Sequence, residues 1–217
     1  MTKQTTLVTR LISTVAGTAA ILIGSGCAQT DITKPKRSAV EELLISRAAD
    51  SAVGEMDVTA LSGKKVYFEE KYVGATDDSD GGYVGDKLYL LGSIRNLISA
   101  NGGRLVDTAG DAEVIVEARS GALSIDNSES LIGMPAVPIP IPSVGTFETP
   151  ELPLYKTEKQ YSVAKVALFA YDASSRKHLL SSGTTTGLSH HHYYKALGII
   201  TWNDTDLPEK STSSAAD

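Results

Sequence analysis

Apolar residues recur at helical spacing in two segments of the chain. The first segment begins at Ser38, which forms an S-x-x-E capping box with Glu41, and it ends near Gly54. The second begins near Gly85 and stops at the Asn-Gly-Gly turn of residues 101–103. We therefore expect two amphipathic helices. Their expected buried residues are Val40, Leu43, Leu44, Ala48 and Ala52 in the first helix, and Leu90, Leu91, Ile94, Leu97 and Ile98 in the second.

Alternating apolar and polar residues predict strands elsewhere. The expected strands are residues 64–72, 105–107, 112–120 with an extension over 122–125, 161–171, 178–187 and 191–202. Residues 161–171 are apolar on both faces, which is typical of a central strand. The pattern predicts an α+β (α/β two-layer) fold, in which a mixed, mainly antiparallel sheet carries two helices packed on one face. The expected core residues are Val66, Phe68, Leu91, Ile94, Val114, Val116, Val166 and Leu168.

A proline-rich segment, residues 133–156, interrupts this pattern. It holds six of the eight prolines, and the run Pro138-Ile139-Pro140-Ile141-Pro142 has proline at every second position. Proline cannot donate to a sheet ladder, so we expect an extended arm in the polyproline II conformation. Two interpretations stay open. The arm packs as a loop on its own domain, or its apolar side chains form an interaction surface for another protein or subunit.

The first 26 residues resemble a bacterial lipoprotein signal peptide. Lys3 and Arg10 precede an apolar stretch, residues 11–23, which is too short to span a bilayer comfortably. Small residues then lead to Cys27, the only cysteine, in the sequence Ile-Gly-Ser-Gly-Cys, which resembles a lipobox. This resemblance implies acylation of Cys27 and a lipid anchor in the bacterial outer membrane, on its periplasmic side. Ala28 follows the cysteine. In enteric bacteria an aspartate at this position tends to retain lipoproteins at the inner membrane, so Ala28 resembles the residue found in outer-membrane lipoproteins.

We expect four parts in the chain. They are a signal peptide over residues 1–26, a lipidated tether over residues 27–37, a single α+β domain over residues 38–204 and a disordered tail over residues 205–217. A hydrophobic content of 41% across 217 residues is enough for a core. The formal net charge of −6 argues against a nucleic-acid partner.

Candidate chemistry is sparse. A single cysteine permits no intrachain disulfide and no cysteine-based metal centre. The chain has no G-x-S-x-G elbow and no complete P-loop, so we expect neither enzymatic activity nor a cofactor. His190 and His192 would share one face of a strand, but two imidazoles do not complete a metal site. A third ligand would have to come from His178, Asp172 or a glutamate, and we therefore expect no tight metal site.

The chain resembles an uncharacterised family of bacterial lipoproteins that is known only as a domain of unknown function. The resemblance rests on residues 38–50, the pair Asp86-Lys87, residues 149–154 and residues 170–172. The order of helices and strands is also similar, at the level of the fold, to accessory lipoproteins of envelope assembly, such as those of curli secretion and lipopolysaccharide assembly. The family brings no assigned activity.

Together, these observations favour a membrane-anchored periplasmic lipoprotein with a structural or assembly role in the cell envelope. Its expected partners are the membrane, through the lipid on Cys27, and an envelope protein or a second copy of the chain. The alternative is a periplasmic lipoprotein that binds a small ligand or a metal ion.

Overall fold

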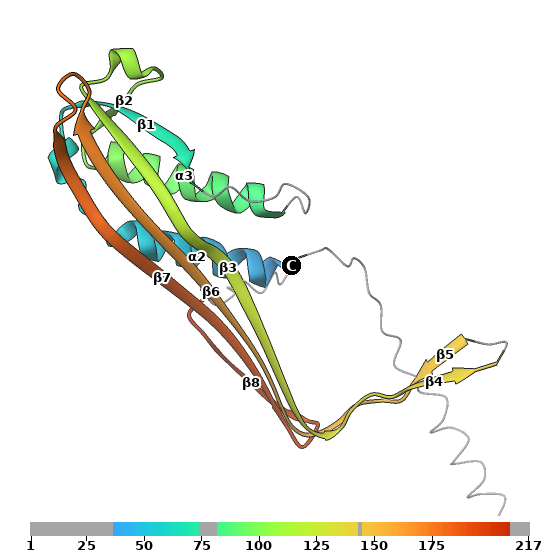
Figure 1. Ribbon diagram of the computed structural model, residues 1–217. Coiled ribbons are helices and arrows are strands. Elements are labelled where there is room, and N and C mark those ends of the chain that lie inside the picture. Colours follow the sequence, from blue (N-terminus) through green and yellow to red (C-terminus); the bar gives the residue numbers. More distant parts are fainter. Residues whose placement is uncertain (1–36, 74–81, 143–144, 209–217) are drawn as a thin grey trace, which may run out of the picture. The chain divides into compact units, whose positions relative to one another are not determined.

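Across the residues that the computed structural model describes, a curled mixed sheet and two α-helices form the fold (Figure 1). The structure describes residues 37–73, 82–142 and 145–208, all of which fall within one compact unit, Lys36–Asp217. The expected signal peptide and Cys27 lie outside the described residues. The observed architecture is α+β, as the sequence predicts.

Six strands form the main sheet in the order β2-β1-β3-β6-β7-β8. β1 is parallel to β2 and β3, and the remaining neighbours are antiparallel, so the sheet is mixed and mainly antiparallel, as expected. β4 and β5 form a separate two-stranded sheet. The elements in chain order are α2 (Ala39–Gly54), β1 (Lys65–Tyr72), α3 (Gly82–Ala100), β2 (Arg104–Leu105), β3 (Val114–Met134), β4 (Pro138–Ile141), β5 (Gly145–Glu148), β6 (Leu152–Asp172), β7 (His178–Ala196) and β8 (Ile200–Thr205), with 3-10 turns at Thr59–Leu61 and Ala109–Asp111.

The capping box predicted at the start of α2 is present. The Glu41 N–H donates to the Ser38 hydroxyl, and the Ser38 N–H donates to the Glu41 carboxylate at 2.7 Å. This backbone hydrogen bond lowers the pKa of Glu41 from its ordinary value. Glu41 also accepts a hydrogen bond from Asn127 of β3. The cap therefore fixes both the start of the helix and its position over the sheet.

The buried face of α2 is rotated from the predicted one. Leu43 is about half exposed and Val40 is only partly buried, so their predicted burial is wrong. The reason is a helical face centred on the alanines, which lets the helix approach the sheet closely. A Cβ at Gly187 of β7 would overlap the Ala48 carbonyl oxygen. The buried residues of α2 are Leu44, Ile45, Ala48, Ala49, Ala52 and Val53.

The hydrophobic core joins both helices to the sheet. All eight predicted core residues are buried, and Leu90, Leu91, Ile94 and Ile98 form the buried stripe of α3 with Leu97 partly buried beside it. Asp50 of α2 accepts hydrogen bonds from Tyr89 and Ser93 of α3 at 2.8 and 3.1 Å, which holds the helices together. α2 contacts β6 and β7 directly. That both helices lie on one face of the sheet stays a prediction.

The central strands are much longer than the sequence pattern indicates. β3 and β6 each have 21 residues and pair with each other along nearly all of their length. β7 has 19 residues and replaces the expected strand 178–187 and part of the expected strand 191–202. Leu197 and Gly198, both with positive φ, then turn the chain into β8. The predicted central position of residues 161–171 is confirmed, since β6 lies between β3 and β7.

The proline-rich segment pairs with itself, whereas we expected a lone extended arm in the polyproline II conformation. β4 and β5 form an antiparallel ladder with Ile139 opposite Phe147. The Val137 N–H and carbonyl both bond to Thr149, so Val137 turns its backbone groups toward β5. By the alternation of an antiparallel strand, Ile139 and Ile141 do the same, and the prolines between them face outward. Proline fits here because an outward position needs no donor.

The main sheet and the separate β4–β5 hairpin divide into two regions. We call residues 65–72, 114–127, 160–172 and 178–191 the covered region, because the buried sheet residues of the hydrophobic core lie in them. We call residues 128–142, 145–159 and 192–205 the distal region. Every buried Ala, Val, Leu, Ile, Met and Phe of the described sheet strands lies outside the distal region. In the part of the chain that the structure describes, no helix is long and apolar enough to cross a membrane.

Candidate functional site

One face of the distal region is apolar and aromatic. Residues that are partners across neighbouring strands share a face of a sheet. One row of such partners crosses four strands and consists of Ile132, Tyr155, Ala196 and Ile200. The next row on this face pairs Tyr194 with Trp202, whose rings stack at 5.3 Å between centroids. We call Ile132, Tyr155, Tyr194, Ile200 and Trp202 the distal apolar face. All but Tyr194 are exposed to solvent.

The opposite face of the distal region is charged. Lys156 lies 2.8 Å from Glu129, 3.1 Å from Glu158 and 3.3 Å from Glu151. The hydrogen bond to Glu129, followed by those to the other two carboxylates, raises the pKa of Lys156 well above its ordinary value, against the opposing effect of burial. The Lys156 cluster therefore lies on the face opposite the distal apolar face.

The predicted interaction residues lie on β4 and at its end. Ile139 is 45% exposed and Ile141 is 41% exposed, and Pro138, Pro140 and Pro142 are exposed as well. Phe147 of β5, opposite Ile139, is also more than half exposed. The hairpin of β4 and β5 therefore buries little of its apolar surface within the described residues. The full set of exposed large apolar residues in the distal region and the β7–β8 turn is Ile132, Met134, Val137, Ile139, Ile141, Phe147, Leu152, Leu154, Tyr155, Leu197, Ile199, Ile200 and Trp202.

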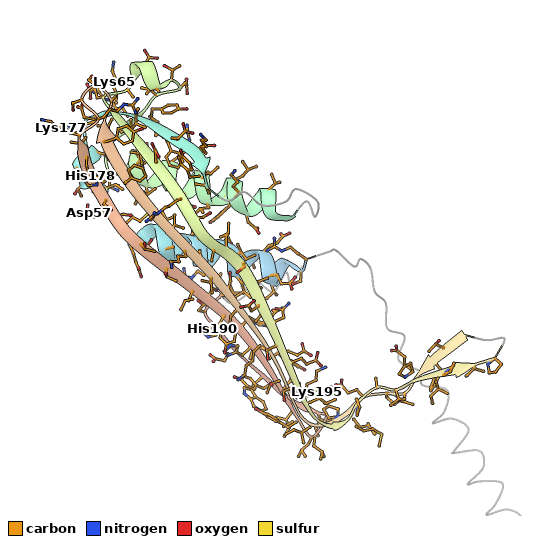
Figure 2. All side chains as sticks on the ribbon, in the orientation of Figure 1. Asp57, Lys65, Lys177, His178, His190 and Lys195 are labelled. Atoms are coloured by element: carbon orange, nitrogen blue, oxygen red, sulfur yellow. The ribbon has the colours of Figure 1, made fainter. Side chains whose placement is uncertain are left out.

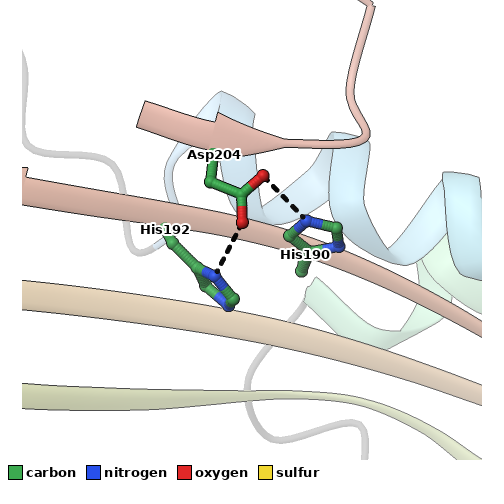
Figure 3. Close-up of side chains that lie close together, drawn as sticks. All are labelled: His190, His192 and Asp204. Carbon is green, nitrogen blue, oxygen red and sulfur yellow. Dashed lines mark ion pairs between the residues drawn. The ribbon is translucent and has the colours of Figure 1, made fainter. Parts of the chain in front are cut away.

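A cluster of His190, His192 and Asp204 lies beside the distal apolar face (Figure 3). Nε2 of His190 is 3.7 Å from Oδ1 of Asp204, and Nδ1 of His192 is 3.6 Å from Oδ2. One nitrogen or oxygen from each side chain lies within 4.8 Å of the others. His190 and His192 share a face because they are two residues apart on β7. Asp204 joins them because the β7–β8 register places it opposite His192.

The environment of His192 disfavours its charged form. The residue is 9% exposed, and its ring packs edge-on against Tyr161 with 4.7 Å between the ring centroids. Burial, and next the positive charge of His190, lower the pKa of His192, against the opposing effect of Asp204. The buried Nε2 atom finds no hydrogen-bond partner among the described residues, which further disfavours the cation. A neutral imidazole retains a lone pair that can bind a metal ion.

A second carboxylate stabilises the strand that carries the histidines. Asp206 accepts hydrogen bonds from the His190 N–H at 2.9 Å and the Ser189 hydroxyl at 2.8 Å. Burial opposes these bonds, yet together with the charge of His190 they lower the pKa of Asp206. Oδ1 of Asp206 also lies 3.9 Å from Nδ1 of His190, on the side of the ring away from the Asp204 contact. Two carboxylates thus flank His190.

The structure separates His178 and Asp172 from the other histidines. His178 begins β7, where it pairs with Tyr171, and Figure 2 shows it well apart from His190 along the strand. Asp172 binds the turn at Ser174 and Ser175 instead. Sequence reasoning did not place Asp204 beside the two histidines. A turn at Leu197 and Gly198 is the feature that could have indicated this contact, because a hairpin there brings residue 204 opposite residue 192.

A family profile described as "Family of unknown function (DUF6655)" matches residues 20–212. The match covers most of the chain, and the protein therefore belongs to this family. A search of curated proteins finds no match.

Proposed function

We propose that the protein is a lipid-anchored periplasmic lipoprotein whose distal region binds another protein of the cell envelope in a structural or assembly role. The observation that carries this proposal is the concentration of exposed apolar and aromatic side chains on the distal region and the β4–β5 hairpin. The likeness in fold to accessory lipoproteins of envelope assembly is part of the same proposal. No catalytic step is included in it.

The composition of the distal apolar face supports a protein partner. Tyrosine and tryptophan are enriched where proteins bind one another, because a rigid ring buries much area at little conformational cost. Here Tyr155, Tyr194 and Trp202 stand beside Ile132 and Ile200 on one face of a sheet. Exposed apolar clusters of this extent on a soluble domain mark interaction surfaces. The partner surface that fits is flat and apolar.

The β4–β5 hairpin supports the interaction hypothesis over self-packing. If Ile139 and Ile141 packed on their own domain, they would be buried, but each is more than 40% exposed. Their replacement by serine should therefore leave stability nearly unchanged, since exposed substitutions shift it by about 0.5 kcal/mol or less. The same change would remove apolar contact area from a bound partner.

Crosslinking in intact envelopes tests this proposal. The test variant is Ile139→Ser with Ile141→Ser, and the control is Leu179→Ser, because Leu179 is 42% exposed at the far end of β7. We expect the double variant to lose a specific crosslinked partner at an unchanged melting temperature, and the control to keep it. Equal recovery in the double variant, or equal loss in the control, would contradict the proposal. A partner that is a second copy of the chain would assign the surface to self-association.

The anchor has its own test. Cys27→Ser removes the only thiol that could accept a diacylglyceryl group. Since stable attachment needs acyl chains, the variant should leave the membrane fraction or accumulate unprocessed. Fractionation of the outer membrane measures this outcome. A variant that still fractionates like the wild type would show that the protein is not held by a lipid on Cys27.

A further inference from the structure

We propose that His190, His192 and Asp204 bind one divalent first-row transition metal ion, for which Zn²⁺ is the reference probe. This inference goes beyond the proposed function and does not depend on it. It rests on the three side chains brought together by β7 and β8, and on the kinds of atoms that they present (Figure 3).

The distances fit an ion better than direct hydrogen bonds. Hydrogen bonds between nitrogen and oxygen are usually about 2.7–3.2 Å long, and both imidazole–carboxylate separations, 3.6 and 3.7 Å, are longer. Zinc bonds of about 2.0–2.2 Å place neighbouring ligand atoms of a tetrahedron about 3.4 Å apart. His190 and His192 approach different oxygens of Asp204, and one ligand atom from each of the three side chains lies within 4.8 Å of the others. Small rotations of the side chains of His190, 35% exposed, and Asp204, 64% exposed, would close these separations around one ion.

The donor set matches this class of ion. Imidazole nitrogens suit Zn²⁺, Cu²⁺, Fe²⁺ and Ni²⁺, and one carboxylate adds the negative charge that partly offsets the charge of the ion. Asp206, flanking His190 on its other side, contributes a second negative charge nearby. Lys159 opposes it, because it pairs with His192 across β6 and β7. Close to the cluster, two carboxylates thus face one ammonium group.

The fold holds the ligands without help from an ion. His192 is fixed by its burial against Tyr161 and by the edge-on contact with Tyr194. Asp204 is held opposite His192 by the β7–β8 ladder, and the Asp206 bonds to residues 189 and 190 close the end of that ladder. Only the His190 ring and the Asp204 side chain then remain to be ordered, which limits the conformational freedom lost on binding.

The arrangement leaves one side of the ion open. Three protein ligands occupy three positions of a tetrahedron, and the Asp204 side chain, 64% exposed, lies on the solvent side. A water molecule or a ligand from a partner would take the fourth position. The proposed site is therefore a bound ion at the edge of the distal apolar face.

Calorimetry on the full-length protein in detergent, after treatment with a chelator, tests the proposal. We expect one equivalent of Zn²⁺ to bind with a dissociation constant of about 1 µM or tighter. Asp204→Asn keeps the shape of an exposed side chain and should fold normally, and His192→Ala removes one nitrogen ligand. Loss of even an outer-shell partner weakens metal binding about 10- to 100-fold, so each variant should bind at least tenfold more weakly. Co²⁺ should give the visible absorption of a four-coordinate ion in the wild type and lose it in both of these variants.

The matched control is His191→Ala, which removes the neighbouring imidazole on the opposite face of β7 and should leave the affinity unchanged. Two results would overturn the proposal. One is an affinity for Zn²⁺ that stays unchanged in Asp204→Asn, or that falls as far in His191→Ala as in His192→Ala. Either outcome would mean that the histidine run binds the ion adventitiously. The other is the absence of binding at concentrations of about 100 µM, well above the expected dissociation constant.

Discussion

The covered and distal regions are built from the same three long strands but have opposite surfaces. In the covered region, β6 alternates buried residues against α2, from Ala164 to Ala170, and supplies much of the core. In the distal region, the same strand presents Leu152, Leu154 and Tyr155 to solvent. A continuous ladder thus links a part that stabilises the fold to a part that leaves its apolar groups exposed. Hydrophobic content alone does not reveal which part serves stability.

The largest contrast should come from one substitution made at two places in β6. Leu168 is 1% exposed and Leu154 is 62% exposed. Leu168→Ala should lower the free energy of unfolding by about 2–5 kcal/mol, because it leaves a cavity in the core. Leu154→Ala should change it by less than about 0.5 kcal/mol. Denaturant unfolding of both variants measures the difference, and similar losses would show that the distal region is packed in solution.

A smaller effect should come from the glycine beneath α2. Gly187→Ala places a methyl group against the backbone of Ala48, so the helix must shift. Such overpacking costs about 1–3 kcal/mol. Gly121→Ala in β3 is the control, since its methyl group would make only ordinary contact with the Lys165 side chain. If thermal melting finds Gly187→Ala as stable as the control, α2 does not approach β7 as closely as described.

The smallest effect concerns the boundary between the regions, where Glu41 caps α2 and meets Asn127. The pKa of Glu41 is lowered in the folded state, so its stabilisation is present above the unfolded value of 4.5 and is lost as the pH falls through the folded value. Glu41→Gln should cost about 0.3–1 kcal/mol at pH 7, and the difference from the wild type should vanish at low pH. Melting curves between pH 7 and pH 3 test this. A difference that persists at pH 3 would assign the effect to packing.

Local signals explain what the sequence predicted well. The capping box at Ser38 and the glycine stop at residues 102–103 act within a few residues, and α2 and α3 begin or end there. The buried positions of β1 and β3 also followed from simple alternation, as at Val66 and Val114. Such features depend on the chain near them, so one sequence suffices to find them.

Long-range pairing explains what the sequence did not predict. Residues 126–130, Asp-Asn-Ser-Glu-Ser, have no strand pattern, yet they pair with residues 157–161 as part of β3. β-Sheet preference is set by neighbours across the ladder, and those neighbours are about 30 residues away along the chain. The sequence did not predict the pairing of Asp204 with His192 for the same reason. The histidine cluster needs the β7–β8 register before any third ligand can be named.

The outward prolines of β4 have a consequence for how the protein can associate. An ordinary edge strand offers free N–H groups, to which a foreign strand can add and so extend the sheet. The outer edge of β4 has proline at positions 138 and 140, with Pro142 directly after the strand, and presents no such donors there. Strand addition along this edge is therefore blocked, for a partner and for another copy of the hairpin alike. Copies of the protein that meet at this edge would not polymerise through β4, and a partner bound along it must recognise side chains.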